Sequence, residues 1–156
     1  MDKEKDNKYF HYYNNNPKGR NKRDCVYRSL GLFLEKSWEE IAELDRDMYL
    51  DKGIMLCSPV EDVDGPIGAE FLVQELGHKE IIILDKPMFY TVQDFIDEQA
   101  ALREKYFVIF RNHVTVIKDK QIWDTWNCYK HFPERIYKYK PIQKSDIKGR
   151  TGIKRK

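Results

Sequence analysis

The chain has 156 residues and a mass of 18.8 kDa, which fits one ordinary domain and excludes a second full one. Hydrophobic residues make up 41% of the chain, enough to form a core and to exclude disorder throughout. The longest aliphatic run, residues 81–84, is far shorter than the roughly 20 apolar residues of a membrane helix. Residues 1–6 contain no apolar secretion signal. We therefore expect a cytoplasmic protein without a membrane partner.

The net charge of +2 is unevenly distributed along the chain. Residues 1–23 carry +4, residues 141–156 carry +5, and the middle carries −7. An acidic body is a poor match to a nucleic-acid-binding fold, whose basic face belongs on the folded domain. We expect residues 141–156 to form a basic C-terminal tail, and nucleic-acid binding through the basic ends ranks lowest among the functions considered.

The cysteines and histidines are widely spaced. Cys25, Cys57 and Cys128 stand far apart, and neither a C-x-x-C nor an H-x-x-x-H pair occurs among them and the four histidines. This spacing disfavours a disulfide framework and gives no zinc motif. We expect neither a structural metal nor a cofactor.

The first half of the chain predicts an irregular arm followed by three helices. Residues 1–23 are polar, rich in turn-forming residues and without a period. Helical spacing of apolar residues then predicts helices over 25–36, from Ser37 to Gly53, and over 67–76. Asp24 is the expected N-cap of the first helix, and Ser37 with Glu40 has the pattern of a capping box.

The second half predicts mainly strands. Residues 81–84 are expected to form a short buried strand, and Thr91 to cap a short helix that runs to residue 100. Further strands are predicted over residues 106–110, 113–118, 121–126 and 135–140. Helices followed by an antiparallel meander indicate an α+β fold, with the N-terminal helices packed on the meander and the domain spanning residues 24–140.

One predicted hairpin places a histidine beside a carboxylate. If Asp119 and Lys120 form a two-residue turn, Thr115 lies opposite Asp124, and His113 becomes a diagonal neighbour of Asp124 on the same face. One hydrogen bond can then join the imidazole to the carboxylate. A three-residue turn would shift the register by one and give this orienting position to Asn127 instead.

A cysteine at the start of a helix can supply the nucleophile for this pair. Cys25 is expected in the first helical turn, where unpaired amides and the helix dipole stabilise a thiolate. His113 packed against that helix start would serve as its general base. The amide of Cys25, together with a side-chain amide from the preceding Asn-rich loop, could stabilise an oxyanion.

Several short motifs carry a resemblance to a known family. They are Asn16-Pro17-Lys18-Gly19, residues 23–30, residues 36–40, His113-Val114-Thr115-Val116 and Trp123-Asp124-Thr125-Trp126. Together they resemble small phage and bacterial proteins with a papain-like cysteine-peptidase fold, which is shared with bacteriocin-processing and cell-wall-type cysteine peptidases. The resemblance implies Cys25 as nucleophile, His113 as base and Asp124 as orienter.

The chain departs from that family at one position. Papain-like enzymes usually carry an oxyanion-hole glutamine six residues before the cysteine, and Gly19 stands there in this sequence. Asn16 and Asn21 are the candidates to replace it. We expect Trp123 and Trp126 to line the wall of the cleft.

The leading hypothesis is a papain-like cysteine peptidase or amidase in a bacterial or infected-host cytosol. It would cleave a peptide, isopeptide or related amide bond of a peptide or protein substrate through an acyl-enzyme on Cys25. The alternative is a catalytically silent papain-like domain that binds a host or phage protein through its cleft and through the aromatic residues 9–13. The substrate and the oligomeric state stay open.

Overall fold

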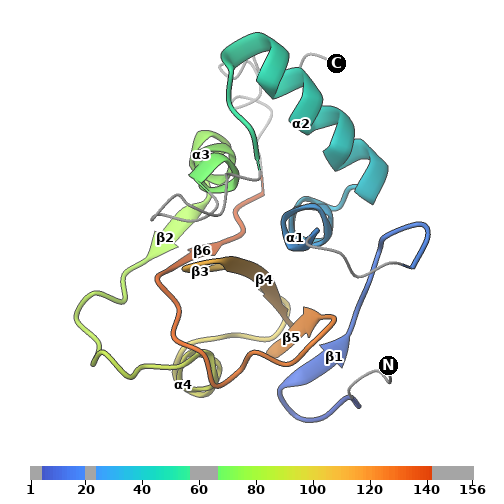
Figure 1. The fold of residues 1–156 in the computed structure, drawn as a ribbon. Helices are drawn as coiled ribbons and strands as arrows, with labels where there is room; N and C mark the ends of the chain where they lie inside the picture. Colours follow the sequence, from blue (N-terminus) through green and yellow to red (C-terminus); the bar gives the residue numbers. More distant parts are fainter. Residues whose placement is uncertain (1–4, 20–23, 57–66, 142–156) are drawn as a thin grey trace.

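A computed structural model describes residues 5–19, 24–56 and 67–141. Asn21, Cys57 and nearly all of the predicted basic tail lie outside these residues. In the described part of the chain the structure contains four helices and six strands (Figure 1). In chain order they are β1 (Phe10–Tyr12), α1 (Cys25–Leu34), α2 (Trp38–Lys52), α3 (Ile67–Glu75), β2 (Lys79–Ile81), α4 (Val92–Glu98), β3 (Lys105–Phe110), β4 (His113–Lys118), β5 (Gln121–Asp124) and β6 (Arg135–Lys138). The predicted α+β class is confirmed.

The strands form one mixed sheet in the order β1-β5-β4-β3-β6-β2. β1 runs parallel to β5, and the other neighbouring strands are antiparallel. The three strands predicted between residues 106 and 126 lie side by side as β3, β4 and β5, but β6 pairs with β3 and not with β5, so the fourth strand does not continue the predicted meander. β1 and β2 extend this sheet at its two edges.

Both faces of the sheet are covered by helices. α1, α2 and α3 lie on one side of the sheet in Figure 1, and α4 lies on the other. Side chains of β3 alternate between the two cores: Phe107 and Ile109 join residues of α1 to α3, whereas Val108 and Phe110 join residues of α4. Burial on both faces explains why β3 is a continuous apolar run.

The helix boundaries follow local chemistry. Ser37 and Glu40 form the predicted capping box at the start of α2, and Gly53 ends α2 in the left-handed conformation. Thr91 and Asp94 form an equivalent capping box on α4. No helix in the described ranges has the length and apolar character needed to cross a membrane.

Two local predictions are wrong. Asp24 is the N-cap residue of α1 as predicted, but its side chain does not make the expected capping hydrogen bond, because other partners hold the carboxylate. Residues 81–84 do not form a buried strand: β2 ends at Ile81, and Leu84 is 88% exposed. Among the described residues, Ile81 is the only member of this run that pairs with a strand, and that strand is β6 next to the sheet edge.

The N-terminal arm is not irregular throughout. Its residues 10–12 form β1, and Phe10 is 0% exposed in the core on the α4 side. Phe10, one of the aromatic residues 9–13, thereby holds the arm to the sheet. Tyr13 continues the pairing, since its amide donates to the carbonyl oxygen of Asp124 at 2.8 Å.

Candidate active site

The β4–β5 hairpin has the predicted register. Asp119 and Lys120 adopt φ angles of 53° and 63°, which a two-residue type I′ turn requires. Lys118 pairs with Gln121, and Val116 pairs with Trp123. This register excludes the three-residue alternative with Asn127 in the orienting position, because it brings Asp124 to the same face of the sheet as His113.

His113 and Asp124 are joined by a direct hydrogen bond. Nε2 of His113 lies 2.7 Å from Oδ2 of Asp124. His113 opens β4 and Asp124 closes β5, so both side chains stand at one end of the hairpin. The contact fixes the ring orientation and leaves Nδ1 as the other nitrogen able to exchange a proton.

Cys25 is the first residue of α1 and reaches the same imidazole. α1 packs along β4, and Oγ of Ser29 donates to the carbonyl oxygen of Val114 at 3.2 Å. This contact places the start of α1 beside the start of β4. The His113 ring and the backbone amide of Val114 both lower the pKa of the Cys25 thiol, so both lie beside its sulfur.

The surroundings favour an ionised Cys25. Burial alone would raise the pKa of this thiol, but the hydrogen bond and charge of His113, the Val114 amide and the charge of Arg28 together hold the pKa below its ordinary value. For His113, burial acts to lower the pKa, and the hydrogen bond with Asp124 outweighs it and raises the pKa well above its ordinary value. The two shifts favour a thiolate paired with an imidazolium.

Asp124 is buried and fully engaged. Its Oδ1 accepts from the Arg28 guanidinium at 3.1 Å and from the Thr125 amide at 2.6 Å, while Oδ2 faces His113. Burial acts to raise the pKa of this carboxyl, but the hydrogen bond and charge of His113, with the charge of Arg28, keep the pKa below its ordinary value. Asp124 therefore stays negative beside the imidazole.

Arg28 links the site to the start of α1. Its buried guanidinium binds both Asp124 and Asp24, one helical turn earlier. Asp24 also accepts from the Asn16 side-chain amide at 2.9 Å and from the Trp38 indole at 2.8 Å. The i, i+4 spacing of Asp24 and Arg28 indicates their pairing, but no local signal indicates the contact with Asp124.

Of the two asparagines expected to contribute to an oxyanion hole, the structure describes Asn16. The Asn16 side-chain amide donates to Asp24, and its oxygen accepts from the Lys18 amide at 2.9 Å. Gly19 closes this turn with φ +65°. A glycine suits that conformation. Asn21 lies outside the described residues. Cys25 opens its helix, so its own amide has no acceptor within the helix.

The two tryptophans have separate surroundings. The Trp126 ring lies 5.0 Å from that of His113 and 5.2 Å from that of His131, so it flanks the candidate base. Trp123 instead packs against His11 of β1 at 4.2 Å. Of the two predicted cleft residues, only Trp126 has a ring contact with His113 among the described residues.

Cys128 belongs to the site, although the sequence analysis assigned it no role. It is 0% exposed, and its sulfur lies within 4.8 Å of a ring nitrogen of His113 and a carboxylate oxygen of Asp124. Burial raises the pKa of Cys128 above its ordinary value. The loop after β5 brings Cys128 back to the ring, which strand periodicity does not predict. Cys57 lies outside the described residues.

The chain was compared with protein families, curated proteins and solved structures. No family model, curated protein or solved structure matches the chain. The chemical interpretation of Cys25, His113 and Asp124 therefore rests on their geometry.

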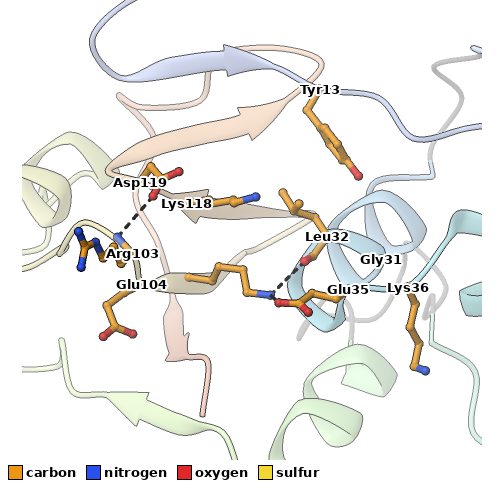
Figure 2. Close-up of a pocket in the computed structure, with 10 residues that line it drawn as sticks. Tyr13, Gly31, Leu32, Glu35, Lys36, Arg103, Glu104, Lys118 and Asp119 are labelled. Atoms are coloured by element: carbon orange, nitrogen blue, oxygen red, sulfur yellow. Dashed lines mark hydrogen bonds and ion pairs between the residues drawn. The ribbon is translucent and has the colours of Figure 1, made fainter. Parts of the chain in front are cut away.

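A separate pocket of about 520 Å³ lies near the other end of α1. Figure 2 shows Leu32 and Glu35 on one side of it and Lys118 and Asp119 on another. The ammonium group of Lys105 is already bound there, to the Phe33 carbonyl oxygen at 2.7 Å and to Glu35 at 3.0 Å. This cation offsets the negative end of the helix dipole. The lining includes none of Cys25, His113 and Asp124.

Proposed function

We propose that the protein is a thiol hydrolase that cleaves a peptide, isopeptide or related amide bond through an acyl-enzyme on Cys25. The observation that carries the proposal is the position of the Cys25 thiol beside His113, whose Nε2 lies 2.7 Å from Oδ2 of Asp124. Nucleophile, base and orienter in this order form the minimum set for covalent acyl transfer.

The chemistry proceeds in two halves. The Cys25 thiolate attacks the substrate carbonyl carbon, and His113, protonated at this stage, gives its proton to the leaving nitrogen as the C–N bond breaks. The resulting thioester is hydrolysed by water, whose proton His113 removes. Asp124 holds the ring through Nε2 and stabilises its positive charge throughout.

A papain-like arrangement is part of the proposal. Its support is the chain order: the cysteine opens α1, the histidine opens β4, and the carboxylate closes the next strand, β5. This order agrees with the family that the motifs resemble.

Two groups are the candidates to stabilise the oxyanion. The Cys25 amide is one donor, since the first amides of a helix lack internal acceptors. Asn16 is the other: its side-chain amide has two hydrogens, of which Asp24 accepts one. Asn16 would then replace the oxyanion-hole glutamine that papain-like enzymes usually carry.

The experiment exposes a library of unmodified peptides to the full chain and maps new termini by mass spectrometry. We expect products with the wild type and none with Cys25→Ala or His113→Ala. Cys57→Ala is the matched cysteine control and should retain the products. Product profiles that are identical for wild type and Cys25→Ala would refute hydrolysis at this residue.

A silent binding module is the second candidate function. The observation in its favour is that Gly19 replaces the glutamine and that Asn16 is tied to Asp24. It predicts that a host or phage protein binds equally well to wild type and Cys25→Ala and stays uncleaved. A thioester intermediate trapped on Cys25 would exclude this candidate.

A further inference from the structure

Beside the proposed nucleophile, three donor atoms of different kinds converge. His113, Asp124 and Cys128 each offer a nitrogen, oxygen or sulfur atom, and these atoms lie within 4.8 Å of one another. Cys128 and Asp124 are buried, and His113 is half-buried. The cluster therefore lies inside the fold, unlike a chance group of carboxylates on the surface.

The spacing is close to that of a tetrahedral metal site. Zinc binds nitrogen, oxygen and sulfur ligands at roughly 2.0–2.3 Å, which sets neighbouring ligand atoms roughly 3.3–3.8 Å apart. The Nε2–Oδ2 distance of 2.7 Å must then open by roughly 0.6 Å, and the sulfur, at most 4.8 Å from the other two atoms, must approach by no more than roughly 1.5 Å. Shifts of this size need only side-chain adjustment.

The donor set selects the class of metal. Mg²⁺ and Ca²⁺ prefer oxygen ligands, whereas a thiolate with an imidazole suits Zn²⁺ and related ions. We propose that His113, Asp124 and Cys128 form a binding site for a thiophilic divalent cation of the Zn²⁺ type. Arg28 occupies Oδ1 of Asp124 at 3.1 Å, so the ligand is Oδ2. The fourth position is left for water.

Binding the cation displaces two protons. Cys128 loses its thiol proton, and His113 loses the proton on Nε2 that it shares with Asp124. The cation then stands where the hydrogen bond between His113 and Asp124 was. Metal binding and a working His113–Asp124 pair thus exclude each other, which makes the cation an inhibitor. This last consequence rests on the proposed hydrolase function, whereas metal binding does not.

The test uses Co²⁺ as a spectroscopic probe of the full chain, with a reductant that does not bind metals. We expect the visible bands of tetrahedral Co²⁺, a thiolate-to-cobalt charge-transfer band, and loss of both when Zn²⁺ is added. Cys128→Ala should abolish the charge-transfer band and weaken Co²⁺ binding by about tenfold or more. Cys25→Ala and Cys57→Ala should keep the band and the affinity.

Three results would overturn the assignment. They are a wild-type complex without the charge-transfer band, an unchanged band in Cys128→Ala, and loss of the band in Cys25→Ala. If Cys128→Ala does not fold, Cys128→Ser replaces it and is expected to lose the band in the same way. Cys25→Ala removes the proposed nucleophile but keeps all three ligands, so failure of the metal site and failure of the hydrolase are separable.

Discussion

At the scale of single residues, Arg28 is the group on which most of the buried charge depends. It lies between Asp24 and Asp124, and all three side chains are buried. Removing one partner of a buried ion pair costs about 3–5 kcal/mol, because the remaining charge is left uncompensated. We expect Arg28→Met to lower the free energy of unfolding by about this amount in urea denaturation.

A matched arginine serves as the control for this change. Arg46 is exposed and lies 3.7 Å from Asp47, so Arg46→Met should change the unfolding free energy by less than about 0.5 kcal/mol. Equal effects of the two substitutions would mean that Arg28 contributes no buried pairing.

The same pairing predicts how stability depends on acid. Burial acts to raise the pKa of Asp24, but hydrogen bonds from Asn16 and Trp38 and the charge of Arg28 outweigh burial. The pKa of Asp24 therefore lies below the ordinary 3.8. The pKa of Asp124 is lowered as well. Because these folded-state pKa values lie below the unfolded ones, the stabilisation is complete above about pH 4 and is lost as the pH falls through the folded values. Arg28→Met should lose less stability than wild type over that acid range. Parallel acid unfolding curves would contradict this.

Residue types and their order indicated the triad, but not the residues around it. Cys25, His113 and Asp124 could be predicted because helix starts and hairpin pairing are local. Cys128 and the Arg28–Asp124 contact could not, because each depends on segments that meet only after the chain has folded.

At the scale of elements, the β4–β5 turn sets the register of the candidate site. Both of its central residues have positive φ, yet neither is glycine. An L-residue in that region costs roughly 1 kcal/mol that glycine avoids. We expect Lys120→Gly to raise the free energy of unfolding by about 0.5–1 kcal/mol.

Another turn lysine provides the comparison. Lys18 is exposed and is not among the positive-φ residues of the described chain, so Lys18→Gly should be neutral or slightly destabilising. A loss of stability in Lys120→Gly equal to that in Lys18→Gly would refute the strain argument.

Elements with strong local signals were predictable, and edge elements were not. Ser37, Thr91 and the hairpin turn each carry their own chemistry, so the helix starts and the register agree with prediction. Residues 81–84 are aliphatic, but β2, which ends at Ile81, is an edge strand with a neighbour on one side. A short apolar run in a sequence does not indicate whether it lies at the edge or in the centre of a sheet.

At the scale of the whole molecule, the N-terminal arm is part of the sheet. β1 pairs with β5, the strand that ends in Asp124, and Phe10 fills the core below it. Truncating a fully buried phenylalanine costs about 3–5 kcal/mol. Phe10→Ala should lower the free energy of unfolding by that amount, measured in urea.

An exposed phenylalanine tests whether burial is the cause. Phe132 is 55% exposed, and Phe132→Ala should change the unfolding free energy by less than about 0.5 kcal/mol. A Phe10→Ala effect of the same small size would show that the arm contributes little to the fold. The pairing of β1 with β5 joins segments over 100 residues apart, which explains why no sequence pattern predicted it.

The most direct test of the central claim is the rate at which iodoacetamide labels Cys25 as a function of pH. We expect the rate to rise with a midpoint below the ordinary thiol pKa of 9.0, and His113→Ala to move that midpoint upward. At pH 6.5 the variant should react about tenfold more slowly for each unit of that shift. A wild-type rate equal to that of a free thiol, or one that His113→Ala leaves unchanged, would contradict the account.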